Sequence, residues 1–410
     1  MQTHLSAEFQ DSDDAKEAAE IMRKCVHCGF CNATCPTYQL LGDELDGPRG
    51  RIYLIKQMLE GSAVTRSTQR HLDRCLTCLN CQTTCPSGVE YGHLVEIGRK
   101  LVDERVERPA AERAVRWTLK EGLTSKLFAP ALRAGQLLRP ILPQVLKDKI
   151  PLRMAARAAN PPEVARPRKV LMLQGCVQPA MLPDIDRAAV RVLDAAGIQT
   201  IHAVGTGCCG ALRTHLSDSE GGLNDMRRNI DAWMPLLDSG EVEAIISSAS
   251  ACALAIKEYG HALAHDATYA HKAARISGLA RDLSELLPEL ATALKQQLRA
   301  VPADRLVFHA PCTLQHGQKL RGGVESQLRQ LGFNIAPACE ENHFCCGSAG
   351  AYSVLQPQLA RQLRDRKLEN LTKSAADTIL SANVGCIQHL QSGTPIPVMH
   401  WIEAIDRALN

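Results

Sequence analysis

The sequence predicts a small helical domain, a basic helical linker and two repeated α/β domains, in that order. Three observations lead to this prediction. A cysteine run occurs twice near the N-terminus, a proline-interrupted basic stretch follows, and a strand–helix–strand pattern with Cys-Cys-Gly then occurs twice. We expect the domains to span residues 1–100, 101–165, 166–300 and 301–410. A chain of 410 residues with 45% apolar residues is large enough for several such cores.

The run Cys-x-x-Cys-x-x-Cys-x-x-x-Cys-Pro occupies residues 25–36 and recurs at residues 75–86. Bacterial ferredoxins use this spacing to hold [4Fe–4S] clusters through thiolates, and the fourth cysteine of each run ligates the other cluster. The first domain is therefore predicted to be an α-helical ferredoxin domain whose two [4Fe–4S] clusters pass single electrons. We assign the ligands as Cys25, Cys28, Cys31 and Cys85 for one cluster, and Cys75, Cys78, Cys81 and Cys35 for the other.

Two alternatives would use the same cysteines. Paired Cys-x-x-Cys knuckles often hold zinc, but a tetrahedral zinc site requires neither the third cysteine of each run nor the proline that follows the fourth. A disulfide framework is disfavoured because the chain opens without a signal peptide, so we expect a reducing compartment.

The segment between the two runs favours a helical domain. Residues 52–60 place Ile52, Ile55 and Leu59 at helical spacing, and Gly61 ends the pattern. This arrangement resembles the helical ferredoxin domain of respiratory iron–sulfur subunits. The small β-rich ferredoxins have their motifs closer together.

The middle of the chain is basic. Residues 99–169 contain 17 Lys or Arg against 7 Asp or Glu, and the helical pattern of residues 94–160 is broken by several prolines. Residues 131–152 mix aliphatic and basic side chains, which would suit an anionic membrane surface, an acidic partner, or an apolar face packed on the protein. We favour the packed helix because the prolines prevent one long amphipathic helix. No apolar run is long enough to span a bilayer.

After the linker, short apolar runs alternate with helical patterns, which predicts α/β domains with parallel sheets. In the first copy we expect strands at residues 169–174 and 198–204 around a helix at 186–196. In the second copy we expect strands at 306–310, 333–336 and 378–383, with a helix at 324–331.

Each copy carries four cysteines in the same order. The single cysteine precedes the Cys-Cys pair by 32 residues in the first copy and 33 in the second, and the last cysteine follows the pair by 43 and 40 residues. This agreement predicts an internal duplication. The two sets are Cys176, Cys208, Cys209 and Cys252, and Cys312, Cys345, Cys346 and Cys386.

These eight thiols follow strand ends or Gly-containing loops, where ligands bind in open parallel sheets. The functional interpretation is a further iron–sulfur centre or a thiol–disulfide exchange site, and the alternative is that they are small buried core residues. Cys339 has no counterpart in the first copy, so we expect no role for it.

Nucleotide binding is not expected. Gly205-x-Gly207-x-x-Gly210 matches a dinucleotide fingerprint, but it overlaps a cysteine pair and lacks the acidic partner of that motif. Walker, zinc-protease and flavin motifs are absent from the sequence, and we expect no flavin, nucleotide or nucleic acid on this chain. The histidines near the cysteine motifs, His316 and His343, are not predicted to be ligands.

The complete order of motifs resembles the iron–sulfur subunits of bacterial glycolate oxidase (glycolate dehydrogenase), over nearly the whole chain. It consists of two ferredoxin runs, the segment Asp46-Gly47-Pro48-Arg49-Gly50-Arg51 between them, a helical link and two Cys-Cys-Gly repeats. The wider superfamily includes lactate-utilisation subunits, a subunit of anaerobic glycerol-3-phosphate dehydrogenase and heterodisulfide reductase subunits.

The resemblance implies a division of labour. An FAD-containing partner oxidises glycolate to glyoxylate, and this chain carries electrons from its flavin towards the quinone pool. It also implies a complex held peripherally on the cytoplasmic side of the bacterial inner membrane. The same path could instead serve lactate or glycerol 3-phosphate.

One departure separates this chain from heterodisulfide reductase. There each Cys-Cys-Gly repeat ends in Cys-x-x-Cys, and five thiolates hold a noncubane cluster. Here Cys252 and Cys386 have no second cysteine at that spacing, which argues against that cluster and against disulfide reduction. Whether these sets bind a metal stays open at this point.

Overall fold

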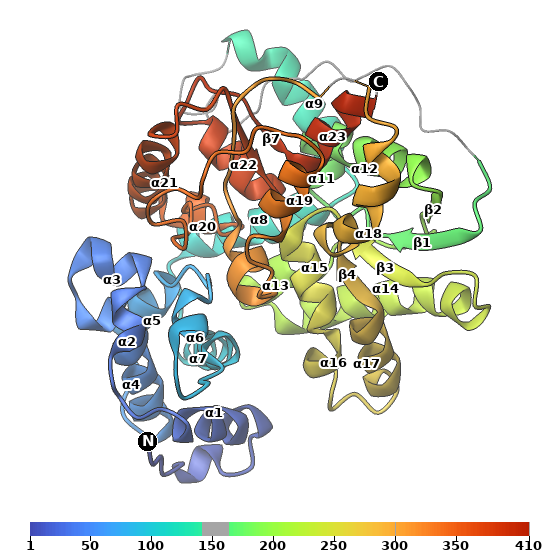
Figure 1. The fold of residues 1–410 in the computed structure, drawn as a ribbon. Helices are drawn as coiled ribbons and strands as arrows, with labels where there is room; N and C mark the ends of the chain where they lie inside the picture. Colours follow the sequence, from blue (N-terminus) through green and yellow to red (C-terminus); the bar gives the residue numbers. More distant parts are fainter. Residues whose placement is uncertain (142–163, 300, 410) are drawn as a thin grey trace.

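A computed structural model describes residues 1–141, 164–299 and 301–409. Its N-terminal part is helical, and its C-terminal part contains two parallel sheets flanked by helices (Figure 1). This arrangement confirms the predicted fold class, whereas the exact limits of the four segments stay a prediction. Within the described residues, no helix has both the length and the apolar character that crossing a bilayer requires.

The N-terminal part is built from short helices joined by the cysteine loops. They are α1 (Asp13–Arg23), α2 (Phe30–Ala33), α3 (Pro36–Leu41), α4 (Pro48–Leu59), α5 (Arg66–Asp73), α6 (Asn80–Thr84) and α7 (Tyr91–Arg105). Helix α4 begins at Pro48, earlier than the predicted residue 52, because proline is well suited to the first helical position. Aliphatic residues of α1, α4 and α7 form the core beneath the loops, including Met22, Ile55 and Leu94.

The first α/β unit is a four-stranded parallel sheet in the order β2-β1-β3-β4. Its strands are β1 (Arg168–Met172), β2 (Ile198–Ile201), β3 (Ala244–Ser247) and β4 (Ala280–Asp282). Its helices are α11 (Gln178–Met181), α12 (Pro183–Ala195), α13 (Ala211–His215), α14 (Ser219–Asp238), α15 (Ser250–Lys257), α16 (Tyr259–Ala262), α17 (Ala270–Leu279) and α18 (Leu283–Lys295). Side chains of β1 alternate between two cores, as period-two strands require.

The second α/β unit repeats this order with three parallel strands, β5-β6-β7. They are β5 (Leu306–Phe308), β6 (Thr378–Ser381) and β7 (Val398–His400). Its helices are α19 (Gly323–Gln330), α20 (Tyr352–Leu355), α21 (Pro357–Thr372), α22 (Val384–Gln391) and α23 (Trp401–Leu409).

One predicted strand of the second unit is wrong. Residues 333–336 lie where β2 lies in the first unit, yet they form only one isolated bridge, between Leu306 and Ile335. Pro337 follows directly and lacks the N–H that a further ladder bond would need. Strand β2 itself ends at Ile201, earlier than the predicted residue 204.

The two units share one hydrophobic core. Helix α12 packs against α23, and both contribute aliphatic side chains to the same buried cluster. A bidentate pair crosses this contact, with Arg191 Nε and Nη2 each 2.7 Å from a carboxylate oxygen of Asp406. We therefore expect the repeats to unfold together rather than as separate domains.

The linker contains α8 (Ala110–Thr124) and α9 (Phe128–Leu138), and neither helix has a fully buried residue. Leu137 and Ile141 are 73% and 79% exposed. Helix α9 nevertheless lies against α11, so the preferred sequence interpretation, an apolar face packed on the protein, is confirmed for only part of the described residues of this stretch. Residues 142–152 of the same stretch lie outside the described residues.

The first α/β unit contacts the N-terminal part through a group of histidines and carboxylates. His93 on α7 stacks on His261 with ring centroids 3.8 Å apart, and its Nε2 lies 3.1 Å from Glu258. His261 in turn lies 2.9 Å from Glu17 on α1. Burial opposes protonation of His93, but the carboxylates of Glu258, Glu96 and Glu17 outweigh it and raise its pKa.

We expect this contact to loosen as the pH rises above the ordinary histidine pKa of about 6.5. A raised pKa in the folded state means that His93 stabilises the contact below its ordinary pKa of about 6.5, and that this stabilisation is lost as pH rises through the folded-state value. Hydrogen exchange of the α16 amides should therefore quicken, beyond the intrinsic rate, between pH 6 and pH 8.5.

The variant His93→Gln should remove most of this pH dependence, whereas His265→Gln should leave it unchanged. The same dependence in His93→Gln as in the original protein would show that another group is responsible.

Candidate metal centres and the cysteine repeats

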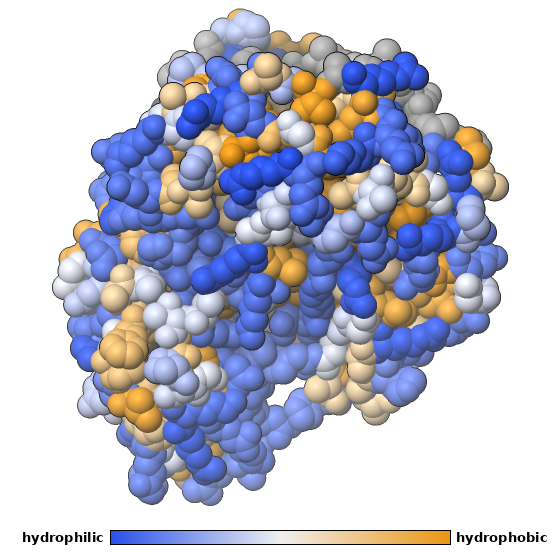
Figure 2. All heavy atoms as spheres, in the orientation of Figure 1, coloured by the Kyte–Doolittle hydropathy of each residue, from blue (hydrophilic) through white to orange (hydrophobic). Residues whose placement is uncertain are grey.

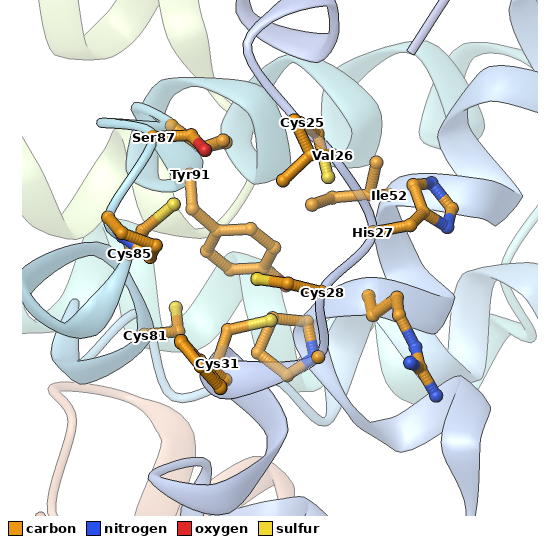
Figure 3. A pocket seen from close by; sticks show the side chains of 16 residues that line it. Cys25, Val26, His27, Cys28, Cys31, Ile52, Cys81, Cys85, Ser87 and Tyr91 are labelled. Carbon is orange, nitrogen blue, oxygen red and sulfur yellow. The ribbon is translucent and has the colours of Figure 1, made fainter.

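The first cysteine run and the end of the second surround one cavity. Figure 3 shows the sulfur atoms around this space, with the ring of Tyr91 beside them. Cys28 is exposed and the other three are half-buried. The thiols that the sequence assigns to the first cluster and that line this cavity are Cys25, Cys28, Cys31 and Cys85.

A second, smaller cavity adjoins the first, and its thiols are all buried. Pro48, Tyr91 and Cys81 line both cavities, so the two spaces are separated by single side chains. The thiols that line the second cavity are Cys35, Cys75, Cys78 and Cys81, the set assigned to the second cluster.

Both Cys-x-x-Cys-x-x-Cys loops bend through left-handed backbone at equivalent positions. These are His27 and Gly29 in the first loop, and Thr77 and Leu79 in the second, with φ between 52° and 84°. For a β-branched residue such as Thr77 this conformation costs about 1–2 kcal/mol. It aims the Thr77 N–H at Cys75 Sγ, 3.4 Å away, so the strain serves the thiol site.

The electrostatics of the first cavity keep its thiols neutral unless a positively charged group binds there. Burial raises the pKa of Cys31, and the neighbouring thiolates of Cys25 and Cys28 raise it further, to about 11. Four thiolates therefore do not stay together unless a cationic group balances them. The residues present thus fit an iron–sulfur cluster, which is bound by thiolates.

Two buried arginines lie next to the thiols of the second cavity. Arg51 is 1% exposed and donates from Nε to the carbonyl of His71 at 2.8 Å and from Nη2 to Thr37 at 3.1 Å. Arg99 donates to the carbonyls of Leu72 and Cys75. Sequence reasoning noticed the segment that contains Arg51 but assigned no role to either side chain.

Arg51 is balanced by a buried carboxylate. Asp46 accepts from Arg74 at 2.8 Å and lies 3.0 Å from His71 Nδ1, and Arg51 Nη2 lies 3.6 Å away. Burial opposes the charge of Arg51, but Tyr91, the thiols of Cys75 and Cys35 and the Asp46 carboxylate together raise its pKa, so it remains a cation. The second cavity therefore contains a fixed positive charge.

The second repeat packs directly on this cavity. Cys78 and Cys345 belong to one buried cluster, with Cys312 packed against it. Asn80 donates to the carbonyl of His343 at 3.2 Å, and Tyr352 donates to the carbonyl of Arg74 at 3.1 Å. Nothing in the sequence pattern indicated this contact.

The histidines near the second cysteine set have different surroundings. His316 contacts Thr83 at 3.2 Å and the carbonyl of His343 at 2.8 Å, so it joins the two parts. His309 lies at the end of β5 and is 1% exposed, and neither ring nitrogen has a hydrogen-bond partner among the described residues. Burial lowers the pKa of His309 well below its ordinary value, so the imidazole is neutral.

The first repeat gathers its thiols away from both cavities. Cys176 donates to Cys208 over 3.5 Å, and the neighbouring thiols of Cys208 and Cys252 together with burial raise the pKa of Cys209. The hydrogen bond from Cys176, together with the Cys209 thiol and the nearby Arg228, lowers the pKa of Cys208.

Comparison with known families agrees with this description. Residues 21–89 match a 4Fe-4S dicluster domain, and residues 170–257 and 306–391 each match a cysteine-rich domain. The match of one family to both repeats confirms the internal duplication, and the dicluster match confirms iron–sulfur clusters rather than zinc in the first domain.

Relatives of known name cover the whole chain. The glycolate oxidase iron–sulfur subunit of Escherichia coli (strain K12) is 50% identical over all of both chains. The probable glycolate oxidase iron–sulfur subunit of Bacillus subtilis (strain 168) is 29% identical over 95% of this chain and 92% of its own length. Lactate utilization protein A of Bacillus licheniformis is 24% identical, covering 58% of this chain and 99% of that protein. By its motifs, its fold and its full-length identity, the chain belongs to the family of glycolate oxidase iron–sulfur subunits.

Proposed function

We propose that this chain carries electrons from an FAD-containing glycolate dehydrogenase subunit, one at a time, towards the quinone pool. Glycolate oxidation releases two electrons and two protons, and the flavin of the partner accepts the electron pair. The observation that carries the proposal is the adjacency of two thiol-lined cavities, which share Cys81 as a lining residue.

In this proposal the first cluster is held by the set of thiols that contains the exposed Cys28, and the second cluster by the set whose thiols are all buried. The support for this division is that three cysteines of one run and the fourth cysteine of the other line each cavity, with Cys81 of the second set also bordering the first cavity. Pairing within each run would instead place Cys35 with the first set, although it lines only the second cavity.

The first cluster is the entry point for electrons. Its surface is the exposed end of the path, because Cys28 is exposed and its neighbours Val26 and Phe30 are 68% and 61% exposed. Figure 2 shows hydrophobic side chains on the N-terminal part over α2 and α4, surrounded by hydrophilic residues. An exposed apolar patch beside a redox centre suits the docking of the flavoprotein partner.

Anaerobic mixing of this chain with its flavoprotein partner and glycolate tests this function. We expect glycolate to reduce both clusters, seen by EPR, only when the flavoprotein is present. Clusters that stay oxidised with partner and glycolate would contradict the proposal. Reduction by lactate or glycerol 3-phosphate instead of glycolate would identify a different partner class.

We also place the complex on the cytoplasmic side of the inner membrane, held through the linker. Leu137, Leu138 and Ile141 are exposed beside Arg133 and Arg139, a combination that suits an anionic lipid surface. The full chain should float with anionic vesicles but not with neutral ones. Replacement of Leu137 and Leu138 by Ser should weaken flotation. Unchanged flotation would contradict membrane contact through the linker.

Arg51 should set the potential of the second cluster. Removing its charge disfavours the reduced cluster, which is more negative than the oxidised one. Arg51→Met should therefore lower the reduction potential by about 60 mV or more, which corresponds to a tenfold change in a one-electron equilibrium constant. Arg51→Lys keeps the charge and should stay close to the original potential. EPR-monitored redox titration measures both, and equal potentials in the two variants would contradict this role.

A further inference from the structure

The two repeats differ at one buried position that bears on metal binding. His309 in the second repeat lies three residues before Cys312, as Leu173 lies three residues before Cys176 in the first. The backbone N–H of each donates to the central strand of its sheet, His309 to Leu380 at 2.8 Å and Leu173 to Ile246 at 3.0 Å. The two residues are therefore structurally equivalent, and only the second repeat offers a nitrogen ligand.

His309 faces two thiols of its own repeat. One of its ring nitrogens and the sulfur atoms of Cys346 and Cys386 all lie within 4.8 Å of one another. The three side chains are buried, and the imidazole makes no hydrogen bond within the described residues. A buried imidazole without a partner is costly, and a bound ion would satisfy it.

We propose that His309, Cys346 and Cys386 bind a single zinc-type ion in the second repeat, separate from the two [4Fe–4S] clusters. Zinc takes a mixed set of imidazole and thiolate ligands, with bonds of about 2.0–2.3 Å. The ring nitrogen and the two sulfur atoms would need to approach one another by only about 1 Å to reach the ligand spacing of a tetrahedral site. A cube would need ligands directed at separate corner irons, whereas these three converge on one point.

A buried positive charge lies on the same side of the repeat. Lys367 on α21 is 2% exposed, and its Nζ donates to the carbonyl of Glu341 at 2.7 Å. Within the described part of the chain no carboxylate lies at ion-pair distance from it. Its electrostatic neighbours include Cys345 and Cys346. The ammonium thus offsets negative charge that thiolates bring to this site.

The ion would act as a structural staple. Its ligands come from the end of β5, from the Cys-Cys-Gly loop and from α22, segments far apart in the sequence. Binding there releases the thiol protons and ties these segments together, as structural zinc does. The same loop carries Cys345, which packs with Cys78, so the ion holds the surface against which the second cluster cavity lies.

Metal analysis of the full chain, purified without oxygen, tests the proposal. We expect about one zinc per chain beside about eight irons from the two clusters. His309→Leu, which installs the residue of the first repeat, should lose the zinc and keep the iron. Exchange of the zinc for Co²⁺ with both clusters left in place should add a high-spin Co²⁺ EPR signal in the original protein and none in His309→Leu.

Matched variants locate the site. Cys209→Ser and Cys252→Ser are the first-repeat counterparts of Cys346→Ser and Cys386→Ser, and only the second pair should lose zinc. His309→Cys supplies another zinc ligand and should retain the ion, which separates ligand loss from misfolding. Full zinc content in His309→Leu, or extra iron with sulfide in place of zinc, would overturn the proposal.

Discussion

Changing Cys78 or Cys28 to serine is expected to abolish glycolate-dependent reduction of a quinone-like dye by the complex. The proposed clusters form a path in series, so loss of either one interrupts it completely. Serine replaces a thiolate that the cluster irons need, and each variant should lose about four irons per chain. The flavin content of the partner should not change, because this chain is not expected to hold flavin.

The two variants should differ in stability. Cys28 is exposed in a surface loop, whereas Cys78 is 8% exposed and packs with Cys345 of the second repeat. We therefore expect Cys78→Ser to lower the thermal midpoint of the chain more than Cys28→Ser does. Cys339→Ser is the control, since Cys339 is half-buried outside both cavities. Normal dye reduction in both cluster variants would rule out the electron path.

Gly50→Ala is expected to lower the free energy of unfolding of the cluster-loaded chain by at least about 3 kcal/mol. A Cβ at Gly50 would lie 2.1 Å from the carbonyl oxygen of Glu44 and 2.9 Å from the Cα of Leu45. Both are backbone atoms, so a rotamer change cannot relieve the overlap. The displaced turn would also move Asp46 away from Arg51, which loosens the charge pair behind the second cavity.

Gly122→Ala provides a matched helical control for this measurement. Gly122 lies in α8, and a Cβ there would meet nothing within 4 Å. Alanine should therefore stabilise the chain by up to about 1 kcal/mol through helix propensity. Urea titration under anaerobic conditions compares the two variants. Equal and small effects would mean that the turn before α4 yields more easily than its packing indicates.

The ferredoxin motifs could be recognised from the sequence because cluster ligation imposes a fixed spacing on neighbouring residues. The repeat was visible for a similar reason, since intervals such as that from Cys176 to Cys208 recur with almost the same length. The alternation of short apolar runs was enough to predict parallel sheets. These features depend on residues close in sequence or on order alone.

Other features depend on contacts that local patterns do not encode. Residues 333–336 are apolar enough for a strand, but Pro337 limits their pairing. Aliphatic residues of α9 suggested a packed face, yet Leu137 is exposed. The packing of Cys78 against Cys345 joins residues far apart in the chain, and His309 becomes notable only when its ring is found buried beside Cys346 and Cys386.

The unequal burial of the two thiol sets has a consequence for the order in which air damages the two clusters. Superoxide and peroxide attack iron–sulfur cubes that they can reach, and only the set containing Cys28 borders solvent. The other set is covered by the second repeat. Oxidative damage should therefore begin at the end that we propose faces the flavin. A partly bleached chain would then still contain its inner cluster but no longer accept electrons.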